Sequence, residues 1–201
     1  MEFLVSILFG YFFGSIPFGL VIAYLAGYGD IRKQGSGNIG TTNVLRVTKR
    51  KDLTILTLIL DAGKAGFAAL LAGWFFSCPL MGLVAGLAGV IGHNFPIWLK
   101  FKGGKGVAST LGMMLATCPM VGVLACLTWV IVAIVFKYSS LSALTALTLA
   151  PFYAYLLGGQ GASDYVLAYA FLALLSMVRH RANIKRLINK EESKINFKKK
   201  K

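Results

Sequence analysis

The chain alternates between long apolar stretches and short polar segments, and the apolar stretches have roughly the length of membrane-spanning helices. A helix needs about 20 apolar residues, with a range of roughly 17–25, to cross the hydrocarbon core of a bilayer. A further stretch, residues 107–136, is long for one span and short for two. The other stretches close to the required length cover residues 3–27, 53–77, 79–99, 140–157 and 163–178.

The composition agrees with a membrane protein and excludes several soluble classes. The 201 residues are 57% hydrophobic and only 14% charged, yet the formal net charge is +14. So few charged residues cannot cover the surface of a soluble domain, and the apolar excess excludes a disordered tail, a soluble nucleic-acid domain and a disulfide-rich secreted module. The three cysteines lack metal-ligand spacing and are predicted to be small buried apolar residues.

The positions of the basic residues predict the topology. Nineteen of the 21 Lys and Arg residues lie in residues 32–51, 100–105 and 179–201. Short basic segments beside spans stay on the cytoplasmic side. All three segments reach that side only if residues 107–136 break near Pro119 into a short helix and a full one, since proline cannot continue the helical ladder. The sequence therefore predicts an all-α polytopic membrane bundle of seven helices, with six as the alternative.

In this topology Met1 lies outside and Lys201 in the cytoplasm. The N-terminus lacks the basic region of a cleavable signal peptide, so the first apolar stretch is expected to be a span. We expect residues 1–192 to form one membrane-embedded domain. Residues 193–201 are expected to form a basic cytoplasmic tail that is attracted to anionic lipid.

The first polar segment gathers hydrogen-bond donors without acidic residues. It reads Gly-Ser-Gly-Asn-Ile-Gly-Thr-Thr-Asn from Gly35 to Asn43, and Arg46 follows. Glycines let a backbone approach a ligand closely, and arginine presents a planar fork of donors to a phosphate. A short helix over 41–47 would add free N–H groups that favour an anion. The segment indicates an anion site, with a simple helix-capping loop as the alternative.

The second polar segment, from Phe101 to Val107, alternates lysine with glycine ahead of an apolar helix. This arrangement is typical of a loop that cradles a phosphate. It is not a Walker A motif, because Lys105 is followed by Gly106 and Val107 rather than by Ser or Thr. A flexible basic loop at the cytoplasmic face is the alternative interpretation.

The third polar segment, from Arg179 to Leu187, predicts an amphipathic helix along the membrane surface. His180 and Asn183 share one face of such a helix. Two further charged residues, Asp61 and Lys64, lie three apart inside the second span, where ionisable groups are costly and usually face the bundle interior. We expect this pair to hold helices together or to line a substrate path, and His93 at the end of the third span to be an interfacial or packing residue.

These segments resemble the bacterial membrane acyltransferases of the PlsY family, which acylate glycerol 3-phosphate from acyl phosphate. The resemblance runs from about Met1 to Glu192. The HxxxxD motif of soluble-type acyltransferases is absent, since Trp98 and Lys185 stand five residues after the two histidines. The motifs that carry the resemblance are Gly14-Ser15-Ile16-Pro17, Ser36 to Asn43 with Arg46, Asp61 with Lys64, Gly92-His93 with Lys102 to Ala108, and His180 with Asn183, Arg186 and Leu187.

The resemblance implies the first acylation of phospholipid synthesis, at the cytoplasmic side of the bacterial inner membrane. The 1-hydroxyl of glycerol 3-phosphate attacks the carbonyl of a fatty acyl phosphate, giving lysophosphatidic acid and inorganic phosphate without a covalent enzyme intermediate. The implied partners are these two substrates and membrane lipids. No cofactor, metal ion, acyl-CoA or nucleic acid is expected. The residues expected to be catalytic are Ser36, Arg46, Lys105, His180 and Asn183.

The residues expected to bind substrate or phosphate are Asn38, Gly40, Thr42, Asn43, Lys102, Gly103, Gly104 and Gly106. An acyl phosphate is already activated, so positioning two anions and stabilising charge could supply most of the rate. We expect Lys105 and the N–H groups of Gly103, Gly104 and Gly106 to hold one phosphate. Ser36 and Arg46 are expected to hold or orient the other substrate's phosphate. Asn38, Thr42, Asn43, His180 and Asn183 are expected to position the hydroxyl and the carbonyl.

Three alternatives stay open at this point. Either phosphate could occupy either basic loop. His180 could remove the proton from the hydroxyl, or an oxygen of the leaving phosphate could accept it; we favour the second, because no acid is placed to orient His180. A transporter of phosphate or of a phosphorylated solute is the alternative function, which the lack of an inverted repeat disfavours.

Overall fold

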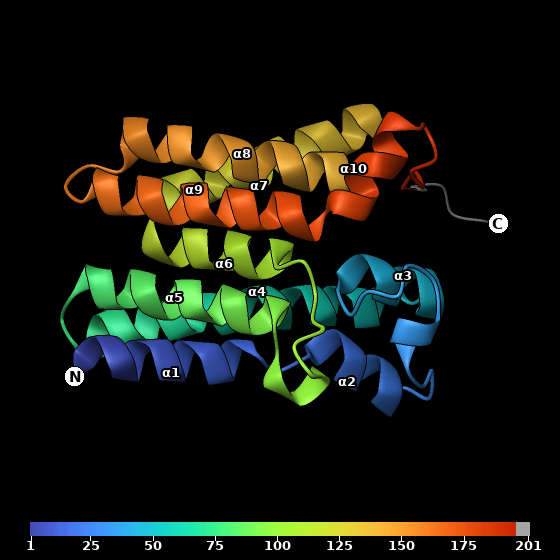
Figure 1. Ribbon diagram of the computed structural model, residues 1–201, viewed down its shortest axis with the longest axis horizontal. Helices are drawn as coiled ribbons and strands as arrows, with labels where there is room; N and C mark the ends of the chain where they lie inside the picture. The colour runs from blue at the N-terminus through green and yellow to red at the C-terminus, as the bar shows by residue number, and fades with distance from the viewer. Residues whose placement is uncertain (196–201) are drawn as a thin grey trace. The chain divides into compact units, whose positions relative to one another are not determined.

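A computed structural model describes residues 1–195, and all regular structure in this range is helical (Figure 1). The last part of the predicted basic tail, residues 196–201 with its lysine run, lies outside the described residues. The chain divides into two compact units, one over Met1–Pro119 and one that begins at Met120.

The first unit contains six α-helices and two short 3-10 turns. The second unit contains the remaining four helices of the described chain, the first of which begins at Pro119. The elements of the first unit are α1 (Glu2–Gly14), α2 (Phe18–Leu25), η1 (Ile31–Lys33), α3 (Thr41–Thr48), α4 (Lys51–Phe75), α5 (Pro79–Asn94), η2 (Ile97–Leu99) and α6 (Val107–Thr117). Those of the second are α7 (Pro119–Phe136), α8 (Ser139–Leu157), α9 (Ala162–Arg179) and α10 (Arg181–Ile188).

The predicted helical membrane architecture is confirmed over residues 1–195. Six segments there are long and apolar enough to cross a bilayer, and α6, with 11 residues, is a shorter apolar helix. The predicted break in the stretch 107–136 is also confirmed, because α6 ends at Thr117 and α7 starts with Pro119. A proline suits the first position of a helix, where its missing N–H has no intrahelical acceptor. The six long segments are Glu2–Leu25, Lys51–Phe75, Pro79–Leu99, Pro119–Phe136, Ser139–Leu157 and Ala162–Arg179.

The length of the first apolar stretch predicts one continuous helix. The structure instead divides this stretch into α1 and α2. The break falls at Ser15, Ile16 and Pro17, where proline supplies no N–H for the ladder. The carbonyl of Ile16, inside this break, accepts hydrogen bonds from the N–H of Phe18 at 3.1 Å and from Lys64 Nζ of α4 at 2.7 Å. A buried cation therefore binds the backbone at the break.

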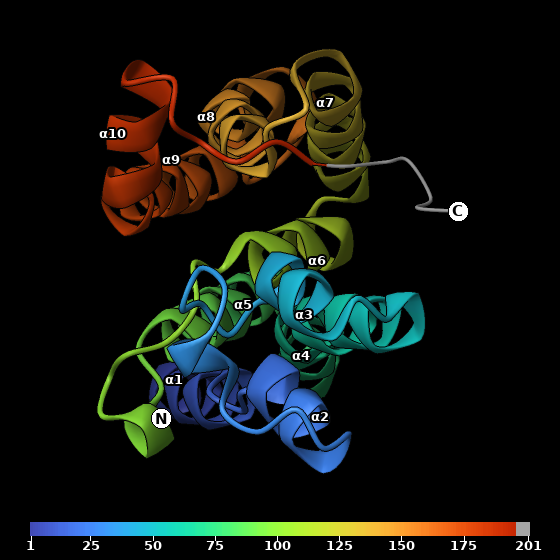
Figure 2. The same ribbon diagram turned by 90° about the vertical axis from the view of Figure 1, so that its right-hand side faces the viewer.

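Small residues allow the helices of the first unit to approach one another closely. Helices α1, α4, α5 and α6 run side by side (Figures 1 and 2). A Cβ atom at Gly10 or Gly14 of α1 would lie only 2.1 Å from the backbone oxygens of Ala85 and Gly89, respectively, in α5. Such contacts between backbones are the common mode of helix packing in membranes, where apolar surface alone gives little drive for association.

The second unit is built around the packing of α8 against α9. Its buried residues are largely alanine, with Leu147, Tyr169 and Leu172 as larger members. Helix α7 is joined to α8 by a hydrogen bond between the hydroxyls of Thr128 and Tyr153 at 2.9 Å. Figure 2 shows α10 standing across the end of α9, so the chain turns sharply at His180.

Candidate functional site

The first polar segment folds onto the ends of α2 and α4 through a small apolar core. Ala23, Ile31 and Val44 are fully buried there and bring η1 and α3 together. Helix α3 spans Thr41–Thr48, which confirms the short helix predicted from residue 41. The apolar side chains thus fix the place of a loop whose remaining residues are polar.

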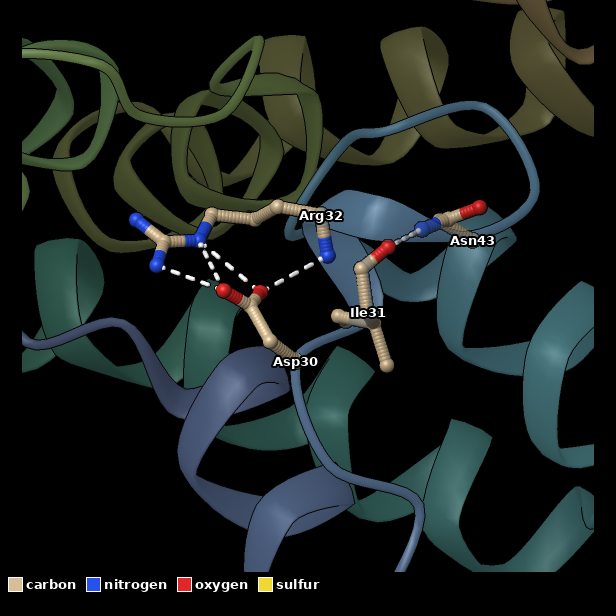
Figure 3. Close-up of polar contacts among 4 residues, drawn as sticks. All are labelled: Asp30, Ile31, Arg32 and Asn43. Atoms are coloured by element: carbon tan, nitrogen blue, oxygen red, sulfur yellow. Dashed lines mark hydrogen bonds and ion pairs between the residues drawn. The ribbon is translucent and has the colours of Figure 1, made fainter.

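Asn43 organises this loop from the inside. Asn43 is 2% exposed, and its Nδ2 donates to the carbonyl of Ile31 at 2.9 Å (Figure 3). The same Nδ2 also donates to the carbonyls of Gln34 (3.2 Å) and Asn38 (2.7 Å). Its Oδ1 accepts from the backbone N–H of Ser36 at 2.7 Å and from the Ser36 hydroxyl at 3.1 Å. The amide of Asn43 is therefore used to shape the loop and to orient Ser36.

Three of the predicted residues of this loop, Ser36, Thr42 and Arg46, are exposed. Thr42 and Arg46 lie four apart on α3 and share a face of that helix. Asn38 Oδ1 accepts from the N–H of Gly40 at 2.9 Å, so its oxygen stabilises the turn that precedes α3. The loop presents hydroxyl and guanidinium donors on its surface and keeps its carboxamides for its own structure.

The acid that precedes η1 is already paired. Asp30 accepts hydrogen bonds from the backbone N–H and from the guanidinium of Arg32, at 2.7–3.1 Å (Figure 3). The side-chain hydrogen bonds from Arg32 lower the pKa of Asp30 to about 2. Asp30 is therefore ionised and neutralised by Arg32.

The glycine-rich loop turns back on the end of α5. The N–H of Gly103 donates to the carbonyl of Asn94 at 3.2 Å, and the N–H of Gly104 donates to the carbonyl of His93 at 3.0 Å. Both amides are therefore engaged with carbonyls at the end of α5, and the role predicted for them in holding a phosphate stays a prediction. Lys102 is exposed and Lys105 is half-buried.

Helix α6 begins directly after this loop. Gly106 caps it with φ = +77°, a left-handed conformation that glycine adopts without strain. The first N–H groups of a helix have no intrahelical acceptors. The loop thus offers Lys102, Lys105 and the start of α6 to an anion.

A buried charged cluster lies beneath the glycine-rich loop. The predicted pairing of Asp61 with Lys64 is confirmed, with 2.9 Å between Asp61 Oδ1 and Lys64 Nζ. His93 Nδ1 lies 3.6 Å from the same carboxylate oxygen. All three residues are at most 4% exposed. They belong to α4 and α5, so the predicted contact between helices is present.

In the second unit, His180 lies at the junction between α9 and α10, one residue before the helix on which it was predicted. Its Nδ1 is 2.9 Å from the carbonyl oxygen of Ser176 and 3.2 Å from the Ser176 hydroxyl. A carbonyl can only accept, so Nδ1 carries a proton. When the ring is neutral, Nε2 therefore bears the lone pair. No sequence pattern predicts this role for Ser176.

Asn183 contacts Glu192, an acid for which no sequence pattern predicts a role. Its Nδ2 donates to Glu192 Oε1 at 2.7 Å, and the Ser140 hydroxyl donates to the same oxygen at 2.8 Å. Arg186 Nε donates to Glu192 Oε2 at 2.7 Å. Burial would raise the pKa of Glu192, but the hydrogen bonds from Asn183, Arg186 and Ser140 hold it below its ordinary value. Ser140 and three residues of the C-terminal segment thus form one network.

Comparison with known proteins decides the family. A family model described as glycerol-3-phosphate acyltransferase matches residues 4–190. The chain belongs to the glycerol-3-phosphate acyltransferase family. It is 56% identical to the glycerol-3-phosphate acyltransferase of Rhodospirillum rubrum, over 98% of this chain and 92% of that protein. It is 53% identical to that of Paramagnetospirillum magneticum, over 100% and 97%.

Solved structures agree with membership in the glycerol-3-phosphate acyltransferase family. The crystal structure of PlsY, an integral membrane glycerol 3-phosphate acyltransferase, in its glycerol 3-phosphate form matches with a TM-score of 0.87 and 36% identity, over 98% of this chain and 96% of that one. The lysophosphatidic acid form matches with a TM-score of 0.83. The family predicted from the motifs is confirmed.

Proposed function

We propose that this protein transfers a fatty acyl group from acyl phosphate to the 1-hydroxyl of sn-glycerol 3-phosphate, without a covalent enzyme intermediate. The products are lysophosphatidic acid and inorganic phosphate. The observation that carries this proposal is the pair of cationic loops in the first unit. The carboxamides and glycine amides of these loops are engaged in hydrogen bonds that shape the loops themselves. Their lysine, arginine and hydroxyl groups suit two anionic substrates. Family membership and the glycerol 3-phosphate and lysophosphatidic acid forms of PlsY support the same substrate and product.

The reaction needs the protein mainly for positioning. The hydroxyl oxygen forms a bond to the acyl carbon, the bond between that carbon and the phosphate oxygen breaks, and the hydroxyl proton ends on the released hydrogen phosphate. Lys105, with Lys102 and the start of α6, holds one phosphate. Arg46 holds the other, with Ser36 and Thr42 as hydroxyl partners and Asn38, Gly40 and Asn43 keeping their loop in shape. Bringing two anions together in this way can supply much of the rate.

The proton passes to the leaving phosphate rather than to the enzyme. The Nδ1–H of His180 faces the neutral carbonyl of Ser176 at 2.9 Å. A neutral acceptor does little to favour an imidazolium, unlike a carboxylate partner. His180 and Asn183 of the second unit keep their predicted role of positioning the hydroxyl and the carbonyl, and within that unit Glu192 holds the Asn183 amide. The His180→Ala variant is expected to retain some turnover. Complete loss of turnover with normal binding of both substrates would contradict proton transfer to the leaving phosphate.

The decisive assay uses purified protein in lipid vesicles, with acyl phosphate and labelled glycerol 3-phosphate. We expect labelled lysophosphatidic acid and one inorganic phosphate per acyl transfer. Lys105→Met is expected to lower kcat/KM by about 100-fold, because a charge-assisted contact to phosphate is lost. Equal use of acyl-CoA, or no lysophosphatidic acid, would overturn the proposal.

The proposed topology gives this chemistry access to cytoplasmic substrates. Seven helices cross the membrane, with Met1 outside, the C-terminus in the cytoplasm and α6 as the short member. This arrangement keeps the three basic segments on the cytoplasmic side of the bacterial inner membrane. We retain residues 1–192 as the catalytic domain, with residues 193–201 as a basic tail for anionic lipid.

A further inference from the structure

The buried cluster of Asp61, Lys64 and His93 has no part in the proposed reaction, yet it is costly to build. Ionisable groups inside a membrane-spanning segment are expensive and usually serve a function. The pair formed by Asp61 and Lys64 is almost fully buried, with 2.9 Å between the charged atoms. Lys64 Nζ is also bound to the carbonyl of Ile16 at 2.7 Å. The carboxylate of Asp61 is thereby fixed in place.

Asp61 lies against both ends of the glycine-rich loop. Its carboxylate oxygen is 3.6 Å from Nδ1 of His93, the penultimate residue of α5. Its backbone carbonyl accepts a hydrogen bond from the hydroxyl of Ser109, in the first turn of α6, at 2.7 Å. A single residue of α4 thus lies beside the helix that enters the loop and is hydrogen-bonded to the helix that leaves it.

The other edge of the His93 ring lies directly under Gly104. A Cβ atom at Gly104 would fall 2.0 Å from His93 Nε2, and 2.8–2.9 Å from Cδ2 and Cε1. The ring is 4% exposed and has Asp61 at its opposite edge, so it has little room to withdraw. The N–H of Gly104 donates to the carbonyl of His93 at 3.0 Å, which fixes the loop against the same residue.

We propose that Asp61, Lys64 and His93 form a positioning cluster that sets the place of the glycine-rich loop, and that Gly104 lacks a side chain because the His93 imidazole fills the space its Cβ would need. None of the three touches substrate in this proposal. They act through the backbone that carries Lys105. The proposal rests on the proposed function only in that the loop holds a substrate phosphate.

A double-mutant cycle between His93 and Gly104 tests the cluster. Gly104→Ala alone is expected to raise the KM of the substrate held by the loop by about tenfold and to change kcat by less than about threefold. In a His93→Ala background, the same glycine change is expected to raise that KM by less than about twofold, because the space is now open. KM is measured separately for glycerol 3-phosphate and for acyl phosphate. Gly63→Ala is the matched control, since Gly63 of α4 has no neighbour within 4 Å of its Cβ position.

The same four variants are also compared by their midpoints of thermal unfolding, a measurement that does not depend on turnover. If the His93→Ala variant cannot be purified, His93→Ser takes its place. We expect Gly104→Ala to lower the midpoint in the wild-type background and to leave it nearly unchanged when His93 is absent. Equal penalties in both backgrounds, in both readouts, would overturn the proposal and assign the glycine to close approach of the ligand. If the wild type makes no lysophosphatidic acid but the unfolding cycle shows coupling, the proposed function fails and the cluster stands.

Discussion

His180 illustrates how a single contact specifies the chemistry of a side chain. The carbonyl of Ser176 can only accept a hydrogen bond, so its distance of 2.9 Å from Nδ1 selects one of the two neutral tautomers. That choice leaves the lone pair on Nε2.

Nitrogen NMR tests this tautomer directly, because the chain has only two histidines. With ¹⁵N-histidine labelling, we expect His180 to give the pattern of a ring protonated at Nδ1 and unprotonated at Nε2 at pH 8. His93→Gln removes one of the two spin systems and assigns the other. A ring protonated only at Nε2 would contradict the geometry described here.

Replacing Asn43 should lower the stability of the protein, because its side chain is hydrogen-bonded to several backbone groups of its loop. Asn43→Ala leaves three carbonyls and the N–H of Ser36 without their present partner, and each buried unsatisfied group costs roughly 1–3 kcal/mol. We expect the free energy of unfolding to fall by at least about 2 kcal/mol, since part of the backbone can turn to water. Thermal unfolding in detergent measures this. Asn189→Ala, at an exposed position after α10, should leave the midpoint nearly unchanged.

At the scale of elements, α4 carries the buried ion pair of Asp61 and Lys64, in which each charge is stabilised by the other. Lys64→Met would leave Asp61 charged and without its lysine, a change that typically costs about 3–5 kcal/mol. The double variant Asp61→Asn, Lys64→Met should be more stable than Lys64→Met alone, because no isolated charge remains. Lys137→Met is the control, because this exposed lysine also lies outside the basic segments. A single variant as stable as the control would show that the pair contributes little.

The C-terminal segment after α10 should be sensitive to acid through Glu192. Its pKa is lowered from an ordinary value of 4.5, since Asn183, Arg186 and Ser140 stabilise the carboxylate despite its burial. The unfolded chain therefore takes up this proton first as the pH falls. The stabilisation is complete above about pH 4.5 and declines below it as the pH passes through the lowered folded value.

Thermal midpoints between pH 3 and 7 measure this effect. We expect the wild-type midpoint to fall more steeply below pH 4.5 than that of Glu192→Gln, which cannot lose a charge. Glu191→Gln, a change at the exposed neighbour, should follow the wild-type curve. Parallel curves for wild type and Glu192→Gln would contradict the assignment.

At the scale of the whole molecule, the number of crossings can be decided at one loop. Gln160 lies in the short connection between α8 and α9. Seven crossings place it outside the cell, whereas six crossings place it inside. In a variant without native cysteines, Gln160→Cys should react with a membrane-impermeant thiol reagent in intact spheroplasts. Lys33→Cys, on the cytoplasmic side in the seven-helix topology, should react only after lysis.

The sequence was sufficient for features that depend on local pattern. The long apolar helices, the break at Pro119 and the short helix from Thr41 were all predicted. Each depends only on residues close together in the chain. The spacing of Asp61 and Lys64 likewise sufficed to predict their pairing, because an α-helix brings residues three apart onto one face.

What could not be predicted depends on which distant residues meet. Asn43 has the chemistry of a ligand-binding residue, and only the fold shows its amide turned to the carbonyls of its own loop. No local pattern links Glu192 to Ser140, 52 positions away, so the network that joins them could not be predicted. Gly103 and Gly104 suggested free amides, and the carbonyls that occupy them belong to the end of α5. Long-range contacts of this kind leave no periodic signal.

The close packing of α1 on α5 has a consequence for how the protein is made. Helix α1 is synthesised before α5, and the end of α1 near Tyr11 is joined to the chain beyond α5 by the hydrogen bond from Tyr11 Oη to the carbonyl of Phe95, 84 positions later. Until the ribosome has delivered that segment, the glycine face of α1 lies in lipid without its partner. Helix α1 therefore reaches its final place in the first unit only after α5 and Phe95 have been made.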